Sequence, residues 1–345
     1  MSDTSHHNPS GLLNGLTYSV PVAGTIRLGR VVTRNNRRLP EKDDQFTVTL
    51  KHKEPGTGQW APHPIQKTLV ERFGTSVEGV GDESKAQAKL RRIPIKIAFD
   101  NPNLSLSEQY AVFNRESRPM CVGNGVTAKR RDLTTGVVSE TPCEGPDGCP
   151  YGVENHCDAI ARLIVQIDDE STVDEFFILR TGSINAVSDC RTVLESYSKL
   201  FGGLAELPMW LTFEAKSSSQ SMQTTFWYAS LKPRFKGMVE GAKLLKNRRE
   251  ADVEAGLDRQ AYEDTLMALR KNGSFAEHSE DMEQFEDLIV GRFVDDTGED
   301  RKIIKISGAA SGINSSVSVV SNALLAHANA QSTAEVQATP AGTSA

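Results

Sequence analysis

ARLIVQID (residues 161–168) and EFFILRT (175–181) are two runs rich in branched and aromatic apolar side chains. Only the polar run DESTVD (169–174) separates them. Two apolar runs joined by a short polar linker are typical of a β-hairpin. The hairpin predicted over 161–181 is the element from which the rest of the fold can be worked out.

The segment that follows, SINAVSDCRTVLESYSKLFGG (183–203), has the pattern of an amphipathic helix. Its apolar residues recur at three- and four-residue steps, and Ser183 can accept a hydrogen bond from the first turn. Gly202 and Gly203 mark its end. Cys190 lies on the apolar side of this helix, where a free cysteine packs as a small hydrophobe, so we assign it to the core.

Alternating apolar residues predict more strands on both sides of this unit. TIRLGRVV, from Thr25, and the alternating stretch Phe46–Leu50 predict a hairpin, and IPIKIAF (93–99) predicts a strand. MWLTFEA (209–215) and TFWYASLK (225–232) predict another hairpin, while PIQKTLVERFG (64–74) predicts a short helix. Sequential strand pairs without long helical crossovers favour an α+β fold in which antiparallel hairpins pack with one or two helices.

Composition sets the domain organisation. The chain has 345 residues with 38% hydrophobic residues, enough for one large or two modest domains. We expect a flexible start at 1–20, an α+β core at 21–236 and a charged helical appendage at 237–306 with a break near Gly256. The Ala-, Ser- and Thr-rich section 307–345 is expected to be a low-complexity, largely disordered tail.

Charge and hydropathy exclude some classes of protein. The net charge is −6, but residues 251–345 hold 16 acidic and 7 basic residues, so the acidity is concentrated near the end. No stretch approaches the roughly 18 apolar residues of a membrane span, and the polar start lacks a signal-peptide core. We therefore expect a protein of the bacterial cytoplasm with no membrane partner.

Four of the five cysteines fall within one segment, with the spacing C-x21-C-x5-C-x7-C. They are Cys121, Cys143, Cys149 and Cys157. The last three are embedded in Pro, Gly and Asp, which form the tight turns that let thiolates converge on a Zn²⁺ ion. Four reduced loop cysteines and an iron–sulfur cluster are the alternatives. The sequence predicts a zinc knuckle inserted at 119–158, with His156 as a reserve ligand.

Such a site would be structural. Four protein ligands leave no open position on zinc, and closed sites of this kind are not catalytic. The chain has no GxSxG, HExxH or GxxxxGK[ST] motif, and its histidines suggest no triad. We therefore predict no catalytic residues.

Basic residues gather in two places. One group lies on the first predicted hairpin and the other follows the first cysteine of the knuckle. Clustered arginines and lysines on a β-ribbon can contact phosphates, although a solvated face is the common alternative. The candidate nucleic-acid-binding residues are Arg27, Arg30, Arg34, Arg37, Arg38, Lys129, Arg130 and Arg131.

The order of these features is informative. GTIRLGRVV, DQFTVT and IPIKIAFDNPNLSLSEQYAVF come first, and the cysteine elements CVGNG, PCEGPDGCP and HC follow. RLIVQI, FFILRTGSINAVSDC and LFGGLAELPMWLTFEAK complete the series. Over about residues 24–236 the chain resembles the recombination directionality factor-like family of phages, plasmids and integrative elements. Its members are often labelled as hydrolases or metal-binding proteins.

The resemblance implies that the protein acts by binding other macromolecules and not by catalysis. A directionality factor binds a site-specific recombinase on DNA and shifts its synapsis toward excision. The four knuckle cysteines look like the family's cysteines. We therefore expect a non-enzymatic, zinc-binding accessory protein of DNA recombination, whose partner is a recombinase or another recombination protein and which can touch DNA. A metal-dependent hydrolase and a stand-alone nucleic-acid-binding module are the alternative functions.

Overall fold

The computed structural model describes residues 19–34, 37–76, 88–114, 118–217 and 226–271. Side chains are not described for 29–34, 37–43, 76 and 226. The chain divides into two compact units, Met1–Arg301 and Lys302–Ala345, and every described residue lies in the first. Of the flexible start predicted at 1–20, residues 1–18 lie outside the described residues, and so do the helical section predicted beyond 271 and the tail at 307–345.

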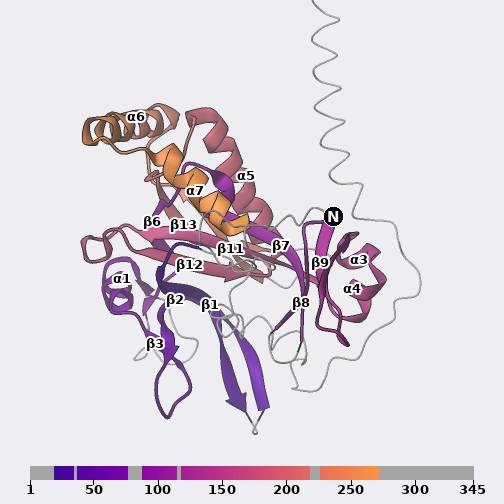
Figure 1. Cartoon of the computed structure of the whole chain (residues 1–345). Helices are drawn as coiled ribbons and strands as arrows, with labels where there is room; N and C mark the ends of the chain where they lie inside the picture. Colours follow the sequence, from indigo (N-terminus) through magenta and orange to yellow (C-terminus); the bar gives the residue numbers. More distant parts are fainter. Residues whose placement is uncertain (1–18, 35–36, 77–87, 115–117, 218–225, 272–345) are drawn as a thin grey trace, which may run out of the picture. The chain divides into compact units, whose positions relative to one another are not determined.

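The hairpin predicted at 161–181 is present at the centre of the sheet (Figure 1). It consists of β11 (Asp158–Ile167), a 3-10 turn (Glu170–Thr172) and β12 (Phe176–Thr181). The two strands are antiparallel, from Ala161 opposite Thr181 to Gln166 opposite Phe176. Both faces carry buried residues, which explains why the sequence of these strands is almost continuously apolar.

The sheet extends from both edges of this hairpin. On one side β11 pairs with β7 and with β6, and β6 continues through β13 to β14. On the other side β12 pairs with β1, which continues through β2 to β3. The bounds are β1 (Val22–Arg34), β2 (Arg37–Lys53), β3 (Trp60–Pro62), β6 (Arg92–Ile97), β7 (Leu106–Phe113), β13 (Pro208–Lys216) and β14 (Phe226–Pro233).

The predicted hairpins β1–β2 and β13–β14 are confirmed, and so is the strand β6. The pairing of β1 with β12 is parallel, which a series of sequential hairpins does not predict. Strands far apart in the chain can adopt this arrangement because each brings an apolar face to the same core. The α+β class predicted from the sequence is correct.

The two helices predicted from the sequence, α1 and α5, pack on the main core. In α1 (Ile65–Phe73) Ile65 and Leu69 are buried. In α5 (Ile184–Phe201) the Ser183 hydroxyl accepts from the Ala186 N–H, and Gly202, at φ 74°, ends the helix in the left-handed conformation. Cys190 is buried on the core side of α5, as its place in the helical pattern predicts.

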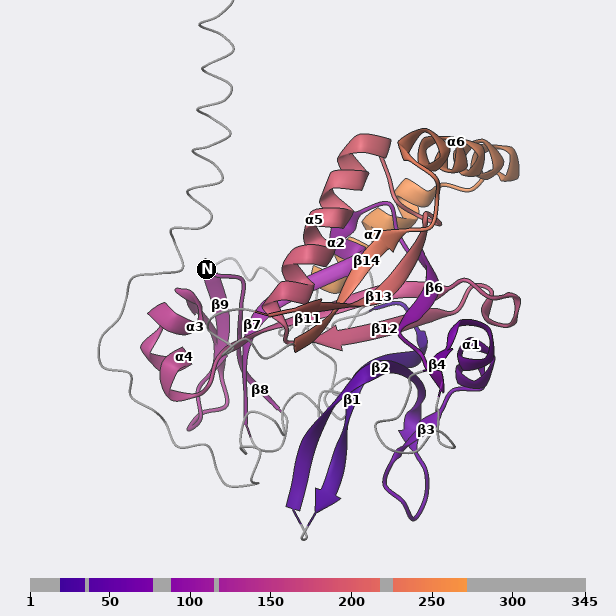
Figure 2. The same cartoon turned by 180° about the vertical axis from the view of Figure 1, so that it is seen from behind.

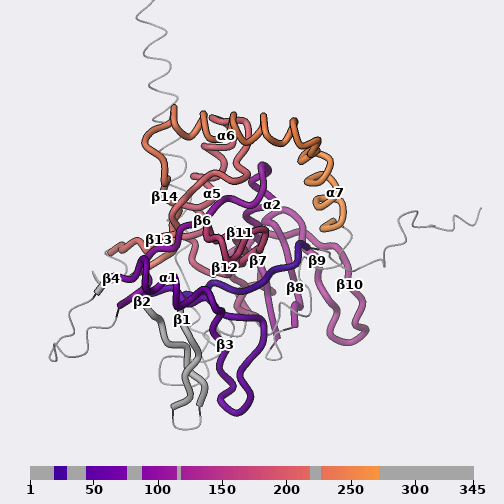
Figure 3. The backbone as a smooth tube through the Cα atoms, turned by 90° about the vertical axis from the view of Figure 1, so that its left-hand side faces the viewer, coloured from indigo at the N-terminus to yellow at the C-terminus, as the bar shows by residue number. Residues whose placement is uncertain are grey.

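The charged section after the sheet is helical as far as it is described. It contains α6 (Met238–Ala255) and α7 (Arg259–Lys271), separated at Gly256 as predicted (Figures 2 and 3). Leu245 of α6 belongs to the main core, and Leu266 and Met267 of α7 pack against a smaller buried cluster that contains Phe99 and Leu104. These helices are therefore attached to the body of the molecule through buried side chains.

The knuckle segment forms a small lobe at the other edge of the sheet (Figure 1). Its elements are β8 (Pro119–Gly123), β9 (Thr127–Arg131), β10 (Val138–Pro142), α3 (Gly145–Gly148) and α4 (Pro150–Glu154). With these strands the main sheet has 12 strands in the described part of the chain. The short strands β4 (Thr75–Ser76) and β5 (Ala88–Lys89) pair with each other, and the short helix α2 spans Pro102–Ser105. No helix among the described residues has the length and apolarity needed to cross a membrane.

Candidate metal centre

The four clustered cysteines come from four different positions of the small lobe. Cys121 is on β8, Cys143 follows β10, Cys149 lies between α3 and α4, and Cys157 precedes β11. All four line one small pocket and none forms a disulfide. The topology thus brings together the side chains that the spacing in the sequence singled out.

Backbone hydrogen bonds hold three of these cysteines in tight turns. The Cys143 N–H donates to Val126 O at 2.9 Å, and the Cys149 N–H donates to Gly145 O at 3.2 Å. The Cys157 N–H donates to Gly152 O at 2.8 Å. These bonds fix where each Cα lies and so direct the thiols toward a common space.

Two glycines allow the cysteines to approach one another. A Cβ on Gly123 would lie 2.7 Å from Cys143 Sγ, closer than real Cβ contacts. A Cβ on Gly152 would lie 3.0 Å from the Cβ of Cys157. Any larger residue at Gly123 would therefore have to displace a cysteine or the strand that carries it.

Arg130 forms one side of the pocket. It lies directly opposite Cys121 across the β8–β9 ladder, and its Nη2 donates to Cys149 Sγ at 3.4 Å. Its guanidinium carbon lies 4.2 Å from the centre of the Tyr151 ring. Burial acts to lower the pKa of Arg130, but hydrogen bonds and charge from Cys121 and Cys149 outweigh burial and raise it. The guanidinium is thus placed to balance negative charge on the sulfur atoms.

The remaining walls of the pocket are apolar. Val112, Met120, Cys121 and Ala128 form a buried cluster against which Cys143, Cys157 and Tyr151 pack. Burial is also the main cause that raises the pKa of the Tyr151 hydroxyl, and the charge of Cys121 adds to it. A poorly solvated set of sulfur atoms strengthens any interaction with a cation.

The chemistry of these donors fits zinc, since soft sulfur ligands in tight turns are its usual structural site. Among the described residues, however, no group of three or more Cys, His, Asp or Glu side chains is arranged to hold a metal ion. The reserve ligand, His156, does not line the pocket and has a positive φ of 54°. The structure thus gathers four sulfur atoms without arranging them as a formed coordination site.

The candidate nucleic-acid-binding residues are found in different environments. Arg27 is buried, its guanidinium carbon 4.2 Å from the Trp60 ring centre. Arg30, Arg34, Arg37 and Arg38 lie on β1 and β2, and their side chains are outside the described part.

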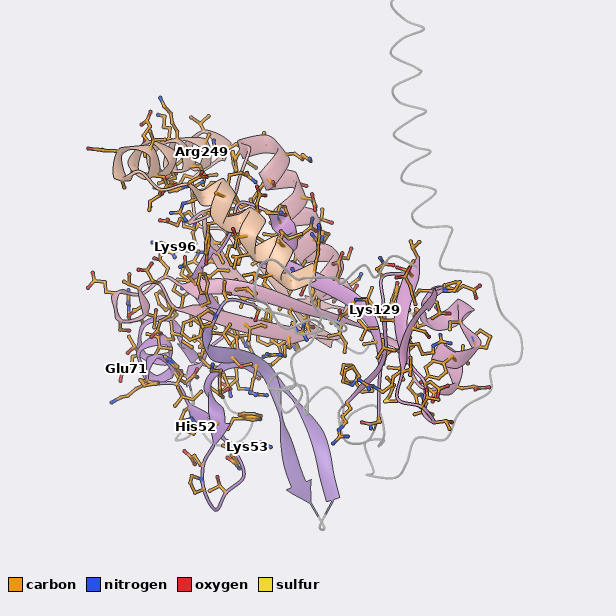
Figure 4. All side chains as sticks on the ribbon, viewed as in Figure 1. His52, Lys53, Glu71, Lys96, Lys129 and Arg249 are labelled. Atoms are coloured by element: carbon orange, nitrogen blue, oxygen red, sulfur yellow. The ribbon has the colours of Figure 1, made fainter. Side chains whose placement is uncertain are left out.

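On β9 the three basic residues divide between the two faces of the strand. Arg130 faces the cysteine pocket, while Lys129 and Arg131 alternate with it. Figure 4 shows Lys129 among the side chains of the small lobe and well apart from Arg249 of α6.

Sequence reasoning missed the partners of the cysteines. It grouped Arg130 with its basic neighbours and gave no role to Gly123, Gly152 or Tyr151. The signal that identifies Arg130 is strand alternation, because Cys121 and Arg130 share one face of an antiparallel pair.

The model of the Gp3-like family, described as recombination directionality factor-like, matches residues 23–234. The chain belongs to this family. No curated protein and no solved structure matched the chain. In this member of the Gp3-like family the match includes all four pocket cysteines and ends at the close of β14, before α6 begins.

Proposed function

We propose that this Gp3-like protein is a non-enzymatic, zinc-binding accessory protein of a phage or another mobile genetic element. It acts in DNA recombination by binding a recombinase–DNA complex, as a directionality factor does. Family membership over residues 23–234 supports the recombination role. The observation that carries the proposal is the gathering of four cysteines at one pocket within the matched region.

In this proposal Cys121, Cys143, Cys149 and Cys157 hold one Zn²⁺. The ion supplies structural cross-linking, since four thiolate ligands leave no position for a substrate. The four cysteines tie β8, the end of β10, the α3–α4 turn and the start of β11 to one point. Arg130 offsets part of the excess negative charge that four thiolates place around a divalent ion.

A lobe that is cross-linked by a metal ion keeps a defined surface, which a protein that acts by binding another protein requires. The lobe has little apolar core of its own: one buried cluster holds Ala111, Phe113, Val122 and Ile160, and the other contains Cys121. Small units with so little buried apolar surface usually need a metal or disulfides to keep a defined surface. Zinc therefore gives the recombinase a rigid surface to bind.

The zinc proposal is tested by metal analysis of the purified full chain. We expect about one zinc per chain, as for other tetrahedral sulfur sites. Changing any one of the four pocket cysteines to Ser should lower the zinc content and destabilise the lobe. Cys190→Ala is the matched control, because Cys190 is buried on α5 and should leave zinc bound. A chain that carries no zinc, or loses it equally in the control, contradicts the proposal.

The recombination role is tested with the recombinase encoded by the same genetic element. We expect the full chain to co-purify with the recombinase and to slow the migration of the recombinase–DNA complex in a gel. Recombination between plasmid-borne attachment sites should change direction when the chain is added. Absence of any complex would overturn the proposed role, and metal-dependent cleavage of DNA or a phosphate ester by the chain alone would favour a hydrolase.

A further inference from the structure

Strands β6, β13 and β14 present a tryptophan with basic side chains around it. Trp210 of β13 lies directly opposite Pro94 of β6 and Lys232 of β14. Directly opposite residues of antiparallel strands share a face of the sheet, and so do residues two positions further along. Arg92 and Lys96 flank Pro94, and Arg234 comes two residues after Lys232. We call the set Trp210, Arg92, Lys96, Lys232 and Arg234 the Trp210 surface.

Two arginines of this surface lie against the Trp210 ring. The guanidinium carbons of Arg92 and Arg234 are 4.9 and 5.0 Å from the ring centre. Phe73, at the end of α1, packs edge-on against the same ring, with the two ring centres 5.5 Å apart. A guanidinium that stacks on an aromatic ring uses its face, and its edge N–H groups remain available to an anion.

The basic groups of the Trp210 surface outnumber the carboxylates that pair with them. Asp168 is shared, since it lies 2.6 Å from Arg234 and 3.5 Å from Lys96. Glu214 lies 3.4 Å from Lys232. Arg92 is exposed and stacks on Trp210, and no carboxylate in the described part of the chain pairs with it. Arg92 is therefore the cation whose charge is not balanced by a neighbour.

Neighbouring helices mark the limits of the surface. On one side Asp189 of α5 accepts a hydrogen bond from Ser230 of β14. On another side Arg72 of α1 pairs with Asp169 at 2.6 Å, so this neighbouring charge is balanced. Figure 4 shows Lys96 at the opposite end of the sheet from Lys129 of the small lobe. The Trp210 surface is thus separate from the cysteine pocket, and it lies within the residues that match the family.

The composition of the surface favours a phosphate backbone as its ligand. Trp210 and Phe73 are each only partly exposed, whereas Arg92 and Lys232 are exposed, so the groups that reach solvent are mainly charged. A protein-binding hot spot would instead offer an aromatic or apolar anchor at its centre. The Trp210 ring already carries two guanidinium groups, which leaves it unsuited to stacking on a base. Cations arranged in this way position a backbone without reading its sequence.

We propose that the Trp210 surface binds the phosphate backbone of duplex DNA, with Arg92 and Lys232 as the principal contacts. Lys232 can exchange its carboxylate for a phosphate because an exposed ion pair contributes little. Arg234 and Lys96 are held by Asp168 and add positive potential beside these contacts. The choice of DNA among phosphate polymers rests on the proposed function, whereas the binding itself does not depend on zinc.

The test measures binding of the purified full chain to two labelled DNA duplexes of unrelated sequence over a range of salt concentrations. One variant combines Arg92→Gln with Lys232→Gln. The matched control combines Lys243→Gln with Lys246→Gln, which removes the same charge from the exposed side of α6. Thermal unfolding of each protein is recorded, and so is its co-purification with the recombinase encoded by the same genetic element.

We expect the wild type to bind both duplexes equally, with a dissociation constant of about 1–100 μM at low salt. The variant of Arg92 and Lys232 should bind both about tenfold more weakly. Its slope of log affinity against log salt should fall by about two, because two phosphate contacts are lost. The α6 control should keep the slope and the affinity of the wild type. Both variants should unfold within about 1 °C of the wild type, since the substituted side chains are exposed.

The proposal is wrong if the wild type binds neither duplex at low salt, or if the two variants weaken DNA binding equally. It is also wrong if Arg92→Gln with Lys232→Gln abolishes co-purification with the recombinase and leaves DNA binding unchanged. That result would identify the Trp210 surface as a protein-binding site. Co-purification of the wild-type chain with the recombinase tests the proposed function separately, so either idea can fail without the other.

Discussion

Gly123 is the residue on which the approach of the cysteines depends most directly. A Cβ at this position would meet Cys143 Sγ at 2.7 Å, Ala128 Cβ at 2.8 Å and Thr127 O at 3.0 Å. We predict that Gly123→Ala destabilises the chain by about 1–3 kcal/mol, the usual cost of overpacking. If the pocket holds zinc, the same change should weaken zinc binding at least about tenfold, measured by competition with a chelator.

Gly182→Ala provides the control for that prediction. A Cβ on Gly182 would meet only Ala159 O, at an ordinary 3.5 Å. This variant should keep both stability and metal binding. Equal losses of stability and metal binding in the two variants would show that contact between a Cβ at Gly123 and its neighbours is not the cause of the loss.

Asp44 gives a residue-level prediction about pH. Burial acts to raise the pKa of this carboxyl on β2, but hydrogen bonds and charge from Lys89 and Arg91 outweigh burial and lower it from 3.8 to about 2. A carboxyl with a lowered pKa in the folded state stabilises the protein above its unfolded pKa. The stabilisation is lost as the pH falls from about 4 to about 2.

We therefore expect Asp44→Asn to lower the free energy of unfolding by about 1 kcal/mol near neutral pH, after allowing for solvent screening of a partly exposed pair. The difference from the wild type should shrink as the pH approaches about 2, as measured by urea unfolding at several pH values. Glu71→Gln, which removes only an exposed pair with Lys67, should show little difference at any pH. If the difference in the free energy of unfolding between Asp44→Asn and the wild type did not change with pH, the lowered pKa of Asp44 would not be the source of the stabilisation.

At the residue scale, the sequence predicts which residues belong to a site better than it predicts which residues surround them. Spacing and turn composition were enough to select the four cysteines that share the pocket, and helical periodicity placed Cys190 in the core. The role of Arg130 was not predictable, because it depends on which residue of β8 lies opposite.

At the scale of elements, ion pairs fasten α6 and α7 to the sheet domain. Arg248 Nη2 lies 2.8 Å from Asp100 Oδ1, and Arg248 Nη1 lies 3.0 Å from Asp252. Asp100 also accepts from the Leu204 and Ala205 backbone N–H groups. Farther along, Glu263 of α7 accepts from the Asp100 and Asn101 N–H groups at 2.6 and 2.9 Å. The helices beyond the family match are thus joined to a residue inside it.

This network predicts the effect of removing Arg248, whose side chain is only 9% exposed. Arg248→Met should destabilise the chain by about 2–4 kcal/mol, because it removes the cation paired with Asp100 and leaves Asp252 with Arg259 alone. Urea unfolding measures the loss, and limited proteolysis should show faster cleavage within 238–271. Lys246→Met, which removes an exposed pair with Glu250, should cost no more than about 0.5 kcal/mol.

If Arg248→Met and Lys246→Met have the same small effect, the network does not hold α6. If Arg248→Met unfolds the chain without earlier cleavage of 238–271, these helices and the sheet form one cooperative unit. The anchoring proposed from the ion pairs requires instead that the helices detach first.

Helices and strands that are marked by their own sequence pattern could be predicted. Strands that are defined only by pairing with another strand could not. Alternation and turn residues gave β6, the hairpins β11–β12 and β13–β14, and the capped helix α5. The strands β9 and β10 carry mostly polar residues with no apolar alternation, and β8 is a short run, PMCVG, that is buried throughout, so none of the three shows the alternation of a half-buried strand. Their pairing comes from the order of the sheet, in which β8 continues from β7.

Across the described part of the molecule, buried apolar residues fall into separate clusters. The main cluster joins the sheet to α1, α5 and α6 and includes Leu163, Phe177 and Leu194. The small lobe is held by two lesser clusters, one containing Ala111 and Phe113 and the other Cys121 and Ala128. A ligand that stabilises only the lobe should therefore change the lobe's stability more than that of the sheet.

This separation leads to a prediction for metal removal, conditional on the proposed zinc. Treating the full chain with a strong chelator should increase amide hydrogen exchange throughout β8–β10 and α3–α4. Exchange in β12 and α5 should stay slow, because their contacts belong to the main cluster. The start of β11 should respond partly, since Asp158 directly follows Cys157 and the strand runs on into the sheet.

Re-addition of zinc should restore the protection, whereas Mg²⁺, which prefers oxygen ligands, should not. The Cys143→Ser variant should exchange like the chelated protein from the outset, and Cys190→Ala like the untreated one. Uniform loss of protection across the sheet and the lobe would mean that the metal holds the whole unit together. Unchanged protection in the lobe would mean that its fold does not depend on a metal at all, and the four sulfur atoms would then need another explanation.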